Sequence, residues 1–333
     1  MHRVLLTGGA GYVGSHTAKR LAKAGFEPVT LDNLSSGHLW AVKWGPLVKG
    51  DIADQTLVRE IVAQYRIEAV LHFAAHASVG ESMLAPRKYF KNNVTGSMRL
   101  LDALLDSSVK HVIFSSTCAV YGPQNCPLKE GHALNPMNPY GDSKLMIERA
   151  LRWYGEAHGL NSVSLRYFNA AGADPDGELG EVHEPETHLI PRAIGAVLGS
   201  RDSVEVYGTD YRTKDGTAVR DYTHVTDLAD AHVLALQHLL EGGKSDAFNL
   251  GTGRGHSVLE VIEAVERITG ERILPRFAAR RAGDPPSLVA DPSKAFDILG
   301  WRAEFSDLHE IVTTAWDWHS SWQQAPGNVA AVS

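Results

Sequence analysis

Short apolar runs alternate with longer amphipathic stretches over the first half of the chain. The apolar runs cover residues 4–6, 29–31, 47–48, 69–73, 111–115 and 162–166, and a stretch with helical periodicity follows each of them. Strands of a parallel sheet are buried on both faces and are joined by helices. The alternation therefore predicts an α/β fold with a doubly wound parallel sheet and helices on both of its faces.

The pattern changes after residue 170. A connection rich in Gly, Pro, Asp and Glu spans residues 172–185, and shorter elements separated by turns follow it. A chain of 333 residues also exceeds the usual size of one domain. We expect a dinucleotide-binding domain over residues 1–170 and a smaller mixed α/β substrate-binding domain mainly over 171–333, from which some segments can return to the first.

A glycine-rich turn follows the first apolar run. Residues 8–14, Gly-Gly-Ala-Gly-Tyr-Val-Gly, fit G-x-G-x-x-G from Gly9 and G-x-x-G-x-x-G from Gly8, and a helix-like stretch follows at residues 15–23. Such a turn lets the backbone approach a pyrophosphate at a helix N-terminus, as in Rossmann-type folds. Glycine-rich turns also close ordinary strand–helix connections, so the motif alone leaves that alternative open.

Two acidic residues at strand ends bear on the choice of dinucleotide. Asp32 ends the second apolar run, at about the spacing of the carboxylate that accepts hydrogen bonds from the adenosine ribose. It would repel the 2′-phosphate of NADP, so we expect NAD. Asp51 follows the third run, where it either flanks an adenine together with Ile52 or caps the next helix.

Tyr140 and Lys144 are candidates for acid–base chemistry. They lie one turn apart on a helix that Asn138-Pro139 is expected to start. A free phenol has a pKa near 10, so a tyrosine base at neutral pH needs roughly three pKa units of lowering, about 4 kcal/mol, from positive charge. Lys144 and an oxidised nicotinamide could supply that charge. Thr117, at the end of an apolar run, can hydrogen-bond the same substrate hydroxyl.

Composition narrows the possible partners. The 32 Lys and Arg residues and 39 Asp and Glu residues are mixed along the chain, which predicts no nucleic-acid or anionic-lipid surface. No run approaches the roughly 18 apolar residues of a membrane span. Cys118 and Cys126 lack the spacing of a disulfide framework or a metal site, and we expect Cys118 to be a packed residue. A cytoplasmic enzyme is expected.

Motifs along nearly the whole chain, to Trp318, together resemble the extended short-chain dehydrogenase/reductase family. They are the glycine turn, Leu31-Asp32-Asn33, His72-Phe73-Ala74-Ala75, residues 114–122, Pro139-Tyr140 with Lys144, Leu165-Arg166-Tyr167-Phe168-Asn169 and Val219-Arg220-Asp221-Tyr222. The motifs of the second half are the more specific, and they are most similar to those of the members that epimerise UDP-hexoses at C4.

The resemblance implies a reaction and its catalytic residues, Thr117, Tyr140 and Lys144. Tyr140 as phenolate takes the proton of the sugar 4-hydroxyl while a hydride passes from C4 to tightly held NAD. The 4-keto sugar turns over and receives the hydride on its other face, which interconverts UDP-glucose and UDP-galactose. In this family such enzymes pair two helices across a two-fold axis. Residues 92–105 and 142–154 match those helices, so a homodimer is expected, although their apolar stripes can instead face only their own sheet.

The resemblance also implies two sets of binding residues. The expected NAD contacts are Gly8, Gly11, Tyr12, Val13, Gly14, Asp32, Asn33, Asp51, Ile52, Phe73, Asn92, Tyr140, Lys144 and Tyr167. The expected UDP-sugar contacts are Thr117, Phe168, Asn169, His188, Leu189, Tyr207, Arg220, Arg281, Asp284 and Leu288. Of these, Tyr207 would lie beside uracil, the two arginines on the pyrophosphate and Asp284 on the uridine ribose.

Some positions depart from the family pattern. Some relatives carry a lysine near Ala77, where this chain has His76-Ala77, and His188 stands where asparagine is frequent, so that a packed histidine is an equal alternative. His183 and His188 lie in a loop with Glu184 and Glu186, without a partner on a second strand, and we expect no metal.

Alternative reactions and sugars remain open. A nucleotide-sugar dehydratase or decarboxylase would need an acidic residue directly after Thr117, but Cys118-Ala119 follow. A reductase that releases its cofactor and a non-catalytic NAD sensor are further alternatives. N-acetylhexosamines and the xylose/arabinose pair compete with the plain hexoses, and Leu288, in place of a tyrosine, would leave room for an N-acetyl group unless it is a core residue.

Overall fold

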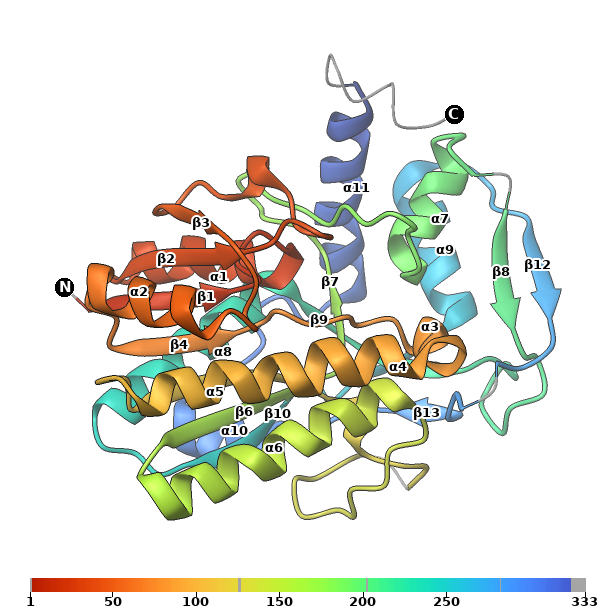
Figure 1. Cartoon of the computed structure of the whole chain (residues 1–333). Helices are drawn as coiled ribbons and strands as arrows, with labels where there is room; N and C mark the ends of the chain where they lie inside the picture. The colour runs from red at the N-terminus through yellow and green to blue at the C-terminus, as the bar shows by residue number, and fades with distance from the viewer. Residues whose placement is uncertain (1, 125–126, 202, 282, 325–333) are drawn as a thin grey trace.

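A seven-stranded parallel sheet forms the centre of the chain (Figure 1). The structure is a computed structural model that describes residues 2–124, 127–201, 203–281 and 283–324, so Cys126 lies outside the described residues. The strands are β1 (Arg3–Thr7), β2 (Glu27–Asp32), β3 (Leu47–Lys49), β4 (Ala69–His72), β5 (His111–Thr117), β6 (Asn161–Tyr167) and β10 (Asp246–Leu250). The six strands predicted from the apolar runs are confirmed, with small differences at their ends.

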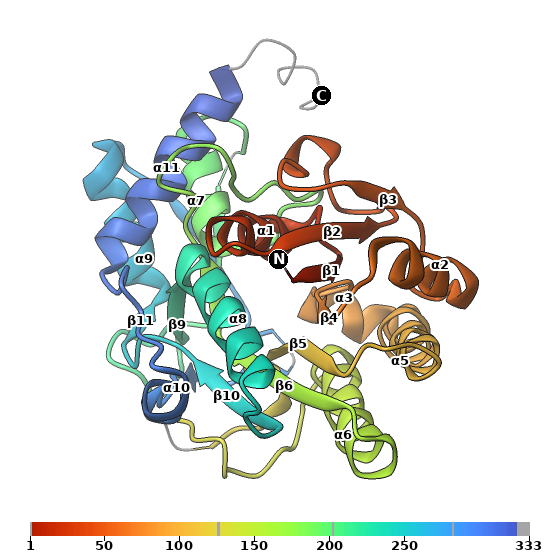
Figure 2. The same cartoon turned by 90° about the vertical axis from the view of Figure 1, so that its left-hand side faces the viewer.

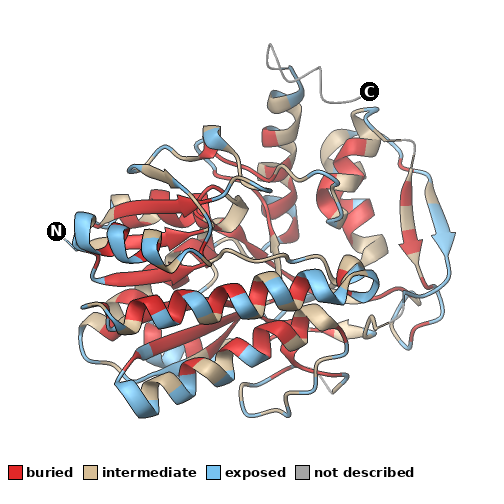
Figure 3. Ribbon diagram, in the orientation of Figure 1, coloured by how far each residue is buried: buried red, intermediate tan, exposed pale blue. Residues whose placement is uncertain are grey.

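Helices cover both faces of this sheet. Successive side chains of a strand point to opposite faces, and accordingly Val4 and Leu6 pack into one core cluster while Leu5 packs into another. The first cluster lies under α1 (Tyr12–Lys23) and α8 (Val225–Leu240), and the second under α2 (Gln55–Tyr65), α5 (Ser97–Leu105) and α6 (Pro139–His158). Figure 2 shows the two layers, and Figure 3 shows the buried strands between them. The doubly wound α/β prediction is confirmed.

The edge of the sheet comes from far along the chain. β10 pairs in parallel with β6, with Phe248 opposite Leu165, and both side chains are buried. α8, which precedes β10, packs along α1 on the same layer. Residues 225–250 thus belong to the central sheet and its covering layer, although the chain between β6 and residue 225 forms elements outside this sheet.

The remaining elements form a smaller part beside the carboxyl ends of the strands (Figure 1). Short strands β7 (Asn169–Ala171), β9 (Val219–His224), β11 (Gly255–Ser257) and β13 (Ser287–Leu288) make a mixed sheet, and β8 (Val204–Tyr207) pairs with β12 (Pro275–Ala278). Helices α7 (Leu189–Val197), α9 (Val258–Thr269) and α11 (Leu308–Gln324) share a third apolar cluster. The short helical elements are η1 (Leu39–Ala41), α3 (Val79–Leu84), α4 (Pro86–Tyr89), η2 (Phe90–Gly96), η3 (Cys118–Val120) and α10 (Ser293–Leu299).

The strand order has a switch point between β1 and β4. The order is β10-β6-β5-β4-β1-β2-β3, so the chain moves outward from β1 in one direction and from β4 in the other. At such a switch point the loops that follow the two strands diverge and leave room for a ligand at the carboxyl edge. The glycine turn follows β1 and Thr117 ends β5, so the candidate residues lie at this edge. No described helix has the length and the apolar character that a membrane crossing needs.

Candidate functional site

The glycine turn leaves no room for side chains. Gly8 has φ +74°, and a Cβ there would lie 2.6 Å from the Ala74 nitrogen, while a Cβ on Gly14 would lie 2.4 Å from the Gly8 oxygen. α1 begins at Tyr12, and no side chain caps its first amides. These amides stand at the start of the helix that follows the carboxyl end of β1, so the turn has the shape and the polarity that a pyrophosphate needs.

Asp32 is fixed next to this turn. Its carboxylate is buried at the end of β2 and accepts hydrogen bonds from the Ala10 nitrogen at 3.0 Å and the Leu34 nitrogen at 2.8 Å. The side chain therefore stands across the turn from the amides of α1. This position agrees with a contact to an adenosine ribose, whose hydroxyls are donors.

Asp51 does not cap the helix that follows it. The N-cap of α2 is Asp54, whose carboxylate accepts a hydrogen bond from Leu57. Asp51 instead accepts from the Ala53 nitrogen at 2.8 Å and from Asn33 Nδ2 at 3.2 Å. Of the two alternatives for Asp51, the helix cap is wrong, because a short turn separates Asp51 from the helix. The role beside an adenine stays a prediction.

The start of α6 positions the candidate base. Asn138 caps the helix by accepting a hydrogen bond from the Gly141 nitrogen, and Pro139 occupies the first turn. Both were read from the sequence, and the predicted helix start is confirmed. Tyr140 lies in the first turn, hydrogen-bonded to the Thr117 side chain, and the buried Lys144 donates from Nζ to the Ser115 carbonyl at 2.7 Å.

Burial acts in opposite directions on the Tyr140 phenol and the Lys144 amine. It raises the pKa of Tyr140 to about 12, although the hydrogen bond from Thr117 lowers it in part. It lowers the pKa of Lys144 to about 7, against the attraction of Glu148. Both groups are therefore shifted toward their neutral forms. Near neutral pH the lysine can take or release a proton, and the tyrosine keeps its own.

Aromatic rings surround the ends of β4 and β6. The Phe73 ring lies 4.7 Å from the ring of His232, and the Tyr167 ring lies 5.9 Å from it. The Tyr167 hydroxyl is hydrogen-bonded to Ser115 Oγ, two residues before the end of β5. The predicted cofactor contacts Phe73 and Tyr167 are thus brought together beside Lys144, which bonds to the same serine's carbonyl.

Asn93 holds this region together and was not singled out in the sequence. It is buried, accepts from the His76 nitrogen at 2.9 Å, and donates to the His76 carbonyl and to Ser143 Oγ, both at 3.0 Å. It thereby fixes the His76-Ala77 segment against the catalytic helix. Asn92, the predicted cofactor contact, donates to the Asn93 side chain. The only sequence signal was an amide on the inner face of an amphipathic stretch.

The predicted nucleotide-binding residues are paired with one another. Arg220 forms an ion pair with Asp284 and donates to the Pro285 carbonyl at 2.8 Å. The Arg281 guanidinium lies over the Tyr207 ring, 3.8 Å from its centroid. The structure thus brings together residues that are far apart in sequence. Their expected roles on the pyrophosphate, ribose and uracil stay predictions.

Leu288 lies between the catalytic residues and the predicted nucleotide-binding residues. It is 9% exposed on β13 and packs in a cluster with Phe168 and Cys118, which directly follows Thr117. Cys118 is a free, buried thiol whose pKa burial raises to about 12, as expected for a packed residue. Asn169 begins β7 next to Phe168. Leu288 is therefore a packed side chain close to the catalytic strand end.

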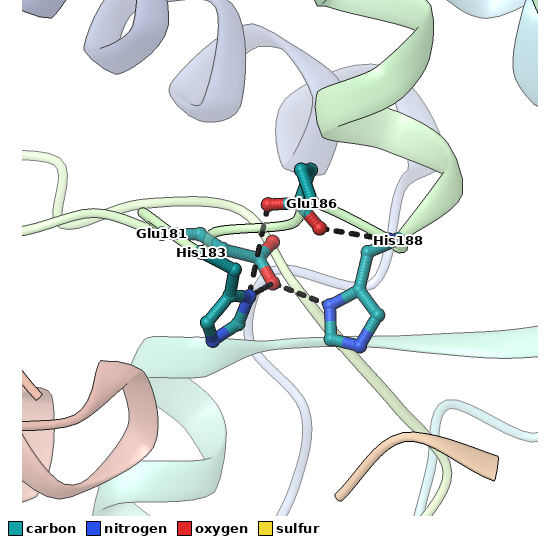
Figure 4. A group of neighbouring side chains, drawn as sticks. All are labelled: Glu181, His183, Glu186 and His188. Atoms are coloured by element: carbon teal, nitrogen blue, oxygen red, sulfur yellow. Dashed lines mark hydrogen bonds and ion pairs between the residues drawn. The ribbon is translucent and has the colours of Figure 1, made fainter. Parts of the chain in front are cut away.

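His188 is drawn into a cluster of histidines and glutamates (Figure 4). It precedes Leu189 at the N-terminus of α7, and its Nδ1 pairs with Glu181, which also lies 3.0 Å from His183 Nδ1. Burial favours neutral His183, but hydrogen bonds to Glu181 and Glu186 outweigh burial and raise its pKa to about 10. The sequence suggested Glu184 in this group. The structure has Glu181 in its place.

Comparison with known proteins agrees with this site. The model of the "NAD dependent epimerase/dehydratase family" matches residues 4–251. A UDP-glucose 4-epimerase of Rhizobium meliloti is 52% identical over 97% of this chain and 98% of its own length.

Two solved structures are also similar over nearly the whole chain. The UDP-glucose 4-epimerase of Brucella ovis, in complex with NAD, has a TM-score of 0.93 at 55% identity and covers 95% of this chain and 98% of its own. That of Stenotrophomonas maltophila, with NAD and formylated UDP-arabinopyranose, has a TM-score of 0.93 at 41% identity and covers 97% and 99%. The chain belongs to the NAD dependent epimerase/dehydratase family and, within it, to the UDP-glucose 4-epimerases, which are isomerases.

Proposed function

We propose that this chain inverts the configuration at C4 of a UDP-hexose, interconverting UDP-glucose and UDP-galactose with NAD. One observation carries the proposal: Thr117, Tyr140 and Lys144 meet at the carboxyl edge of the sheet, beside a turn shaped for a dinucleotide. The similar enzymes whose solved structures hold NAD support the same cofactor.

The residues at the crevice fit NAD. Gly8 and Gly14 keep the turn open to a pyrophosphate, and Asp32 places a buried carboxylate where the adenosine ribose hydroxyls would donate to it. Phe73 and Tyr167 line the end where Lys144 lies, which suits a nicotinamide ribose. When bound, NAD accepts a hydride from the sugar and returns it, and its oxidised ring carries a positive charge.

Tyr140 is the residue that moves the proton. In its phenolate form Tyr140, next to Thr117, would take the proton of the sugar 4-hydroxyl, and the resulting phenol would give that proton back. Burial raises the pKa of this phenol to about 12, so the protein's own groups do not hold it as phenolate at neutral pH. We infer that the positive charge of the oxidised cofactor, together with a protonated Lys144, supplies the lowering that the sequence led us to expect.

The UDP part would be held by Arg220, Arg281, Asp284 and Tyr207. Arginine pairs with phosphate oxygens through a planar fork of donors. Because Arg220 is already paired with Asp284 in this structure, the nucleotide exchanges these contacts rather than finding free groups. The plain hexoses are the proposed substrates. N-acetylhexosamines and the pentose pair are the alternatives that the packed Leu288 leaves to experiment.

We also propose a homodimer through α5 and α6. These helices lie side by side on one surface (Figure 1), and α6 exposes Met146 and Trp153, the latter at 58%. Exposed large apolar side chains on adjacent helices favour an interface. Light scattering at micromolar concentration should give the mass of two chains, and Trp153→Glu should shift it toward one. A clean monomer of the parent would contradict the proposal.

The reaction can be tested without adding cofactor. The purified protein is incubated with UDP-glucose, UDP-galactose, UDP-N-acetylglucosamine and UDP-xylose in turn, and the products are resolved by chromatography. We expect the C4 epimer of the hexoses, with no net change in absorbance of reduced nicotinamide. Stoichiometric accumulation of reduced cofactor, or a dehydrated product, would overturn the proposed reaction.

Cofactor choice has its own test. Asp32→Ala removes the carboxylate next to the turn, so bound NAD should be lost more easily and NADP should become less disfavoured. The readout is the nicotinamide content after gel filtration, with each dinucleotide supplied beforehand. Unchanged retention and preference would mean that Asp32 only supports the turn through Ala10 and Leu34.

A further inference from the structure

Four side chains of one loop converge on a common centre. Glu181, His183, Glu186 and His188 lie between β7 and α7, with the spacing E-x-H-x-x-E-x-H, and one nitrogen or oxygen atom from each lies within 4.8 Å of all the others. Figure 4 shows both imidazole rings turning Nδ1 toward the Glu181 carboxylate, with Glu186 above them. The four residues will be called the 181–188 cluster.

Two of the separations between these atoms are close to those of a metal coordination shell. Ligand atoms about 2.0–2.1 Å from a tetrahedral zinc ion stand about 3.3 Å from one another. His183 Nδ1 lies 3.0 Å from Glu181 Oε1 and 3.6 Å from Glu186 Oε2. His188 Nδ1 is hydrogen-bonded to the same Glu181 oxygen, so these two atoms would have to move apart to admit an ion. We propose that the 181–188 cluster binds one first-row divalent metal ion, with Zn²⁺ as the best fit.

The ligand types and charges support this choice. Two imidazole nitrogens with two carboxylates suit zinc, whereas calcium and magnesium prefer oxygen ligands alone. The two carboxylates together carry the charge that a divalent ion balances. Among the described residues neither Glu181 nor Glu186 forms an ion pair with a lysine or arginine. Their partners are the two histidines, which would release their protons when an ion binds.

A second carboxylate cluster shows what an occupied centre looks like. Asp174, Asp176 and Glu178 also bring three oxygens together, but Lys19 Nζ lies 2.6 Å, 2.8 Å and 2.6 Å from them. The amine fills the position that an ion would take. Among the described residues, the 181–188 cluster has the imidazole nitrogens of His183 and His188 at the corresponding place and no lysine.

Surrounding groups orient the proposed ligands. Glu186 Oε1 accepts from the Thr187 and His188 nitrogens at 2.7 and 2.8 Å, which leaves Oε2 toward His183. Trp318 Nε1 donates to the Glu181 carbonyl at 3.3 Å, and the Tyr12 ring meets the His183 ring edge-on at 6.3 Å. Such outer contacts are typical of metal sites. A bound ion would therefore link the glycine turn, the loop and α11.

The test measures metal directly in the full-length protein. The protein is treated with a chelator, loaded with Zn²⁺, desalted and analysed for metal by mass spectrometry. We expect about one zinc per chain, and Co²⁺ loading should give the visible absorption of a tetrahedral site. His183→Gln and Glu181→Gln should lose both signals. His2→Gln is the matched control, because His2 pairs with Glu68 at 2.6 Å in an exposed His–Glu contact.

The outcomes separate a metal site from an ion-paired network. A parent protein that retains only a small fraction of one zinc per chain, and shows no cobalt bands, overturns the proposal. Equal metal loss in His2→Gln and His183→Gln overturns it as well, because the binding is then not specific to the cluster. If Glu181→Gln proves unfolded by circular dichroism, the comparison rests on His183→Gln, whose side chain is 32% exposed in the parent, together with the cobalt spectrum of the parent.

Discussion

The catalytic end and the nucleotide end of the crevice are built in different ways. At the catalytic end, Thr117 and Tyr140 meet because a strand ends where a capped helix begins, and Lys144 is anchored on a backbone carbonyl. At the nucleotide end, Arg220 and Asp284 satisfy each other's charge from short strands and loops. The first arrangement is set by the fold itself, while the second has to exchange partners when a ligand arrives.

This difference has an energetic consequence. The catalytic side chains are positioned by a strand end and a helix start and need not break an ion pair before they act. Their removal should therefore lower the turnover rate. Groups already paired contribute only the difference between the old contacts and the new ones, so their removal should appear as a modest change in affinity. The predictions that follow test this division.

Tyr140→Phe should have the largest effect. It removes the hydroxyl that carries the proton, so turnover should fall by roughly two to four orders of magnitude while UDP binding survives. Steady-state rates and calorimetric titration with UDP measure the two quantities separately. If the turnover of the variant stays within tenfold of the parent, another group transfers the proton. If UDP binding falls together with turnover, the catalytic and nucleotide ends do not act separately.

Lys144→Met should stabilise the protein while it reduces activity. Burial lowers the pKa of Lys144 from 10.5 to about 7, so the unfolded chain binds more protons between these values. The penalty of burying the amine is thus complete below pH 7 and disappears as the pH rises toward 10. One pKa unit corresponds to about 1.4 kcal/mol, so the substitution should raise the free energy of unfolding by a few kcal/mol at most. The loss of the hydrogen bond to Ser115 reduces this gain.

Denaturant unfolding from pH 6 to pH 10 measures this gain. The difference in unfolding free energy between Lys144→Met and the parent should be greatest at the acidic end and shrink steadily toward the basic end. Lys110→Met, at an exposed lysine just before β5, is the control and should give a flat difference. A gain that does not vary with pH would mean that the amine is not buried in its neutral form.

Arg281→Ala should weaken UDP-sugar binding by about ten- to a hundredfold, since hydrogen bonds to charged groups contribute about 1.5–3 kcal/mol. Turnover at saturating substrate should change little. Arg276→Ala, at an exposed arginine on β12, is the matched control. A turnover loss comparable to that of Tyr140→Phe would place Arg281 with the catalytic end instead.

Leu288→Tyr should have the smallest effect, and it acts where the two ends meet. A ring added to this packed position would narrow the space near Phe168, so any reaction of UDP-N-acetylglucosamine should fall more than that of UDP-glucose, by about 1–3 kcal/mol in discrimination. The ratio of kcat/KM for the two substrates is the measurement. Equal losses, or no N-acetylhexosamine turnover in the parent, would identify Leu288 as a core residue only.

The sequence indicated those parts of the molecule that depend on local pattern. The six strands with continuous apolar runs, the glycine turn and the start of α6 at Asn138 all follow from neighbouring residues. The family resemblance supplied the fold and the reaction type, and the comparisons confirmed both. The NAD and UDP-sugar contacts that the resemblance implies stay predictions.

Contacts between segments that are distant along the chain could not be predicted from the sequence pattern. β10 is short, with polar residues at Asp246 and Asn249, so its pattern did not mark it as a strand of the main sheet. The pairing of Arg220 with Asp284 joins residues 64 positions apart. A helix cap was one of two alternatives for Asp51, but the cap is Asp54, because two Asp residues lie in one short turn and only the backbone geometry selects between them.

The late arrival of β10 has a consequence for the nascent chain. At about 5–20 residues per second, a ribosome needs many seconds to pass from β6 to β10. During that time one edge of the sheet, along β6, lacks its partner, and the apolar residues that α8 will cover are open to water. An exposed edge strand pairs readily with other chains. Chaperones that bind extended apolar segments should therefore engage this chain most strongly while residues 170–250 are being made.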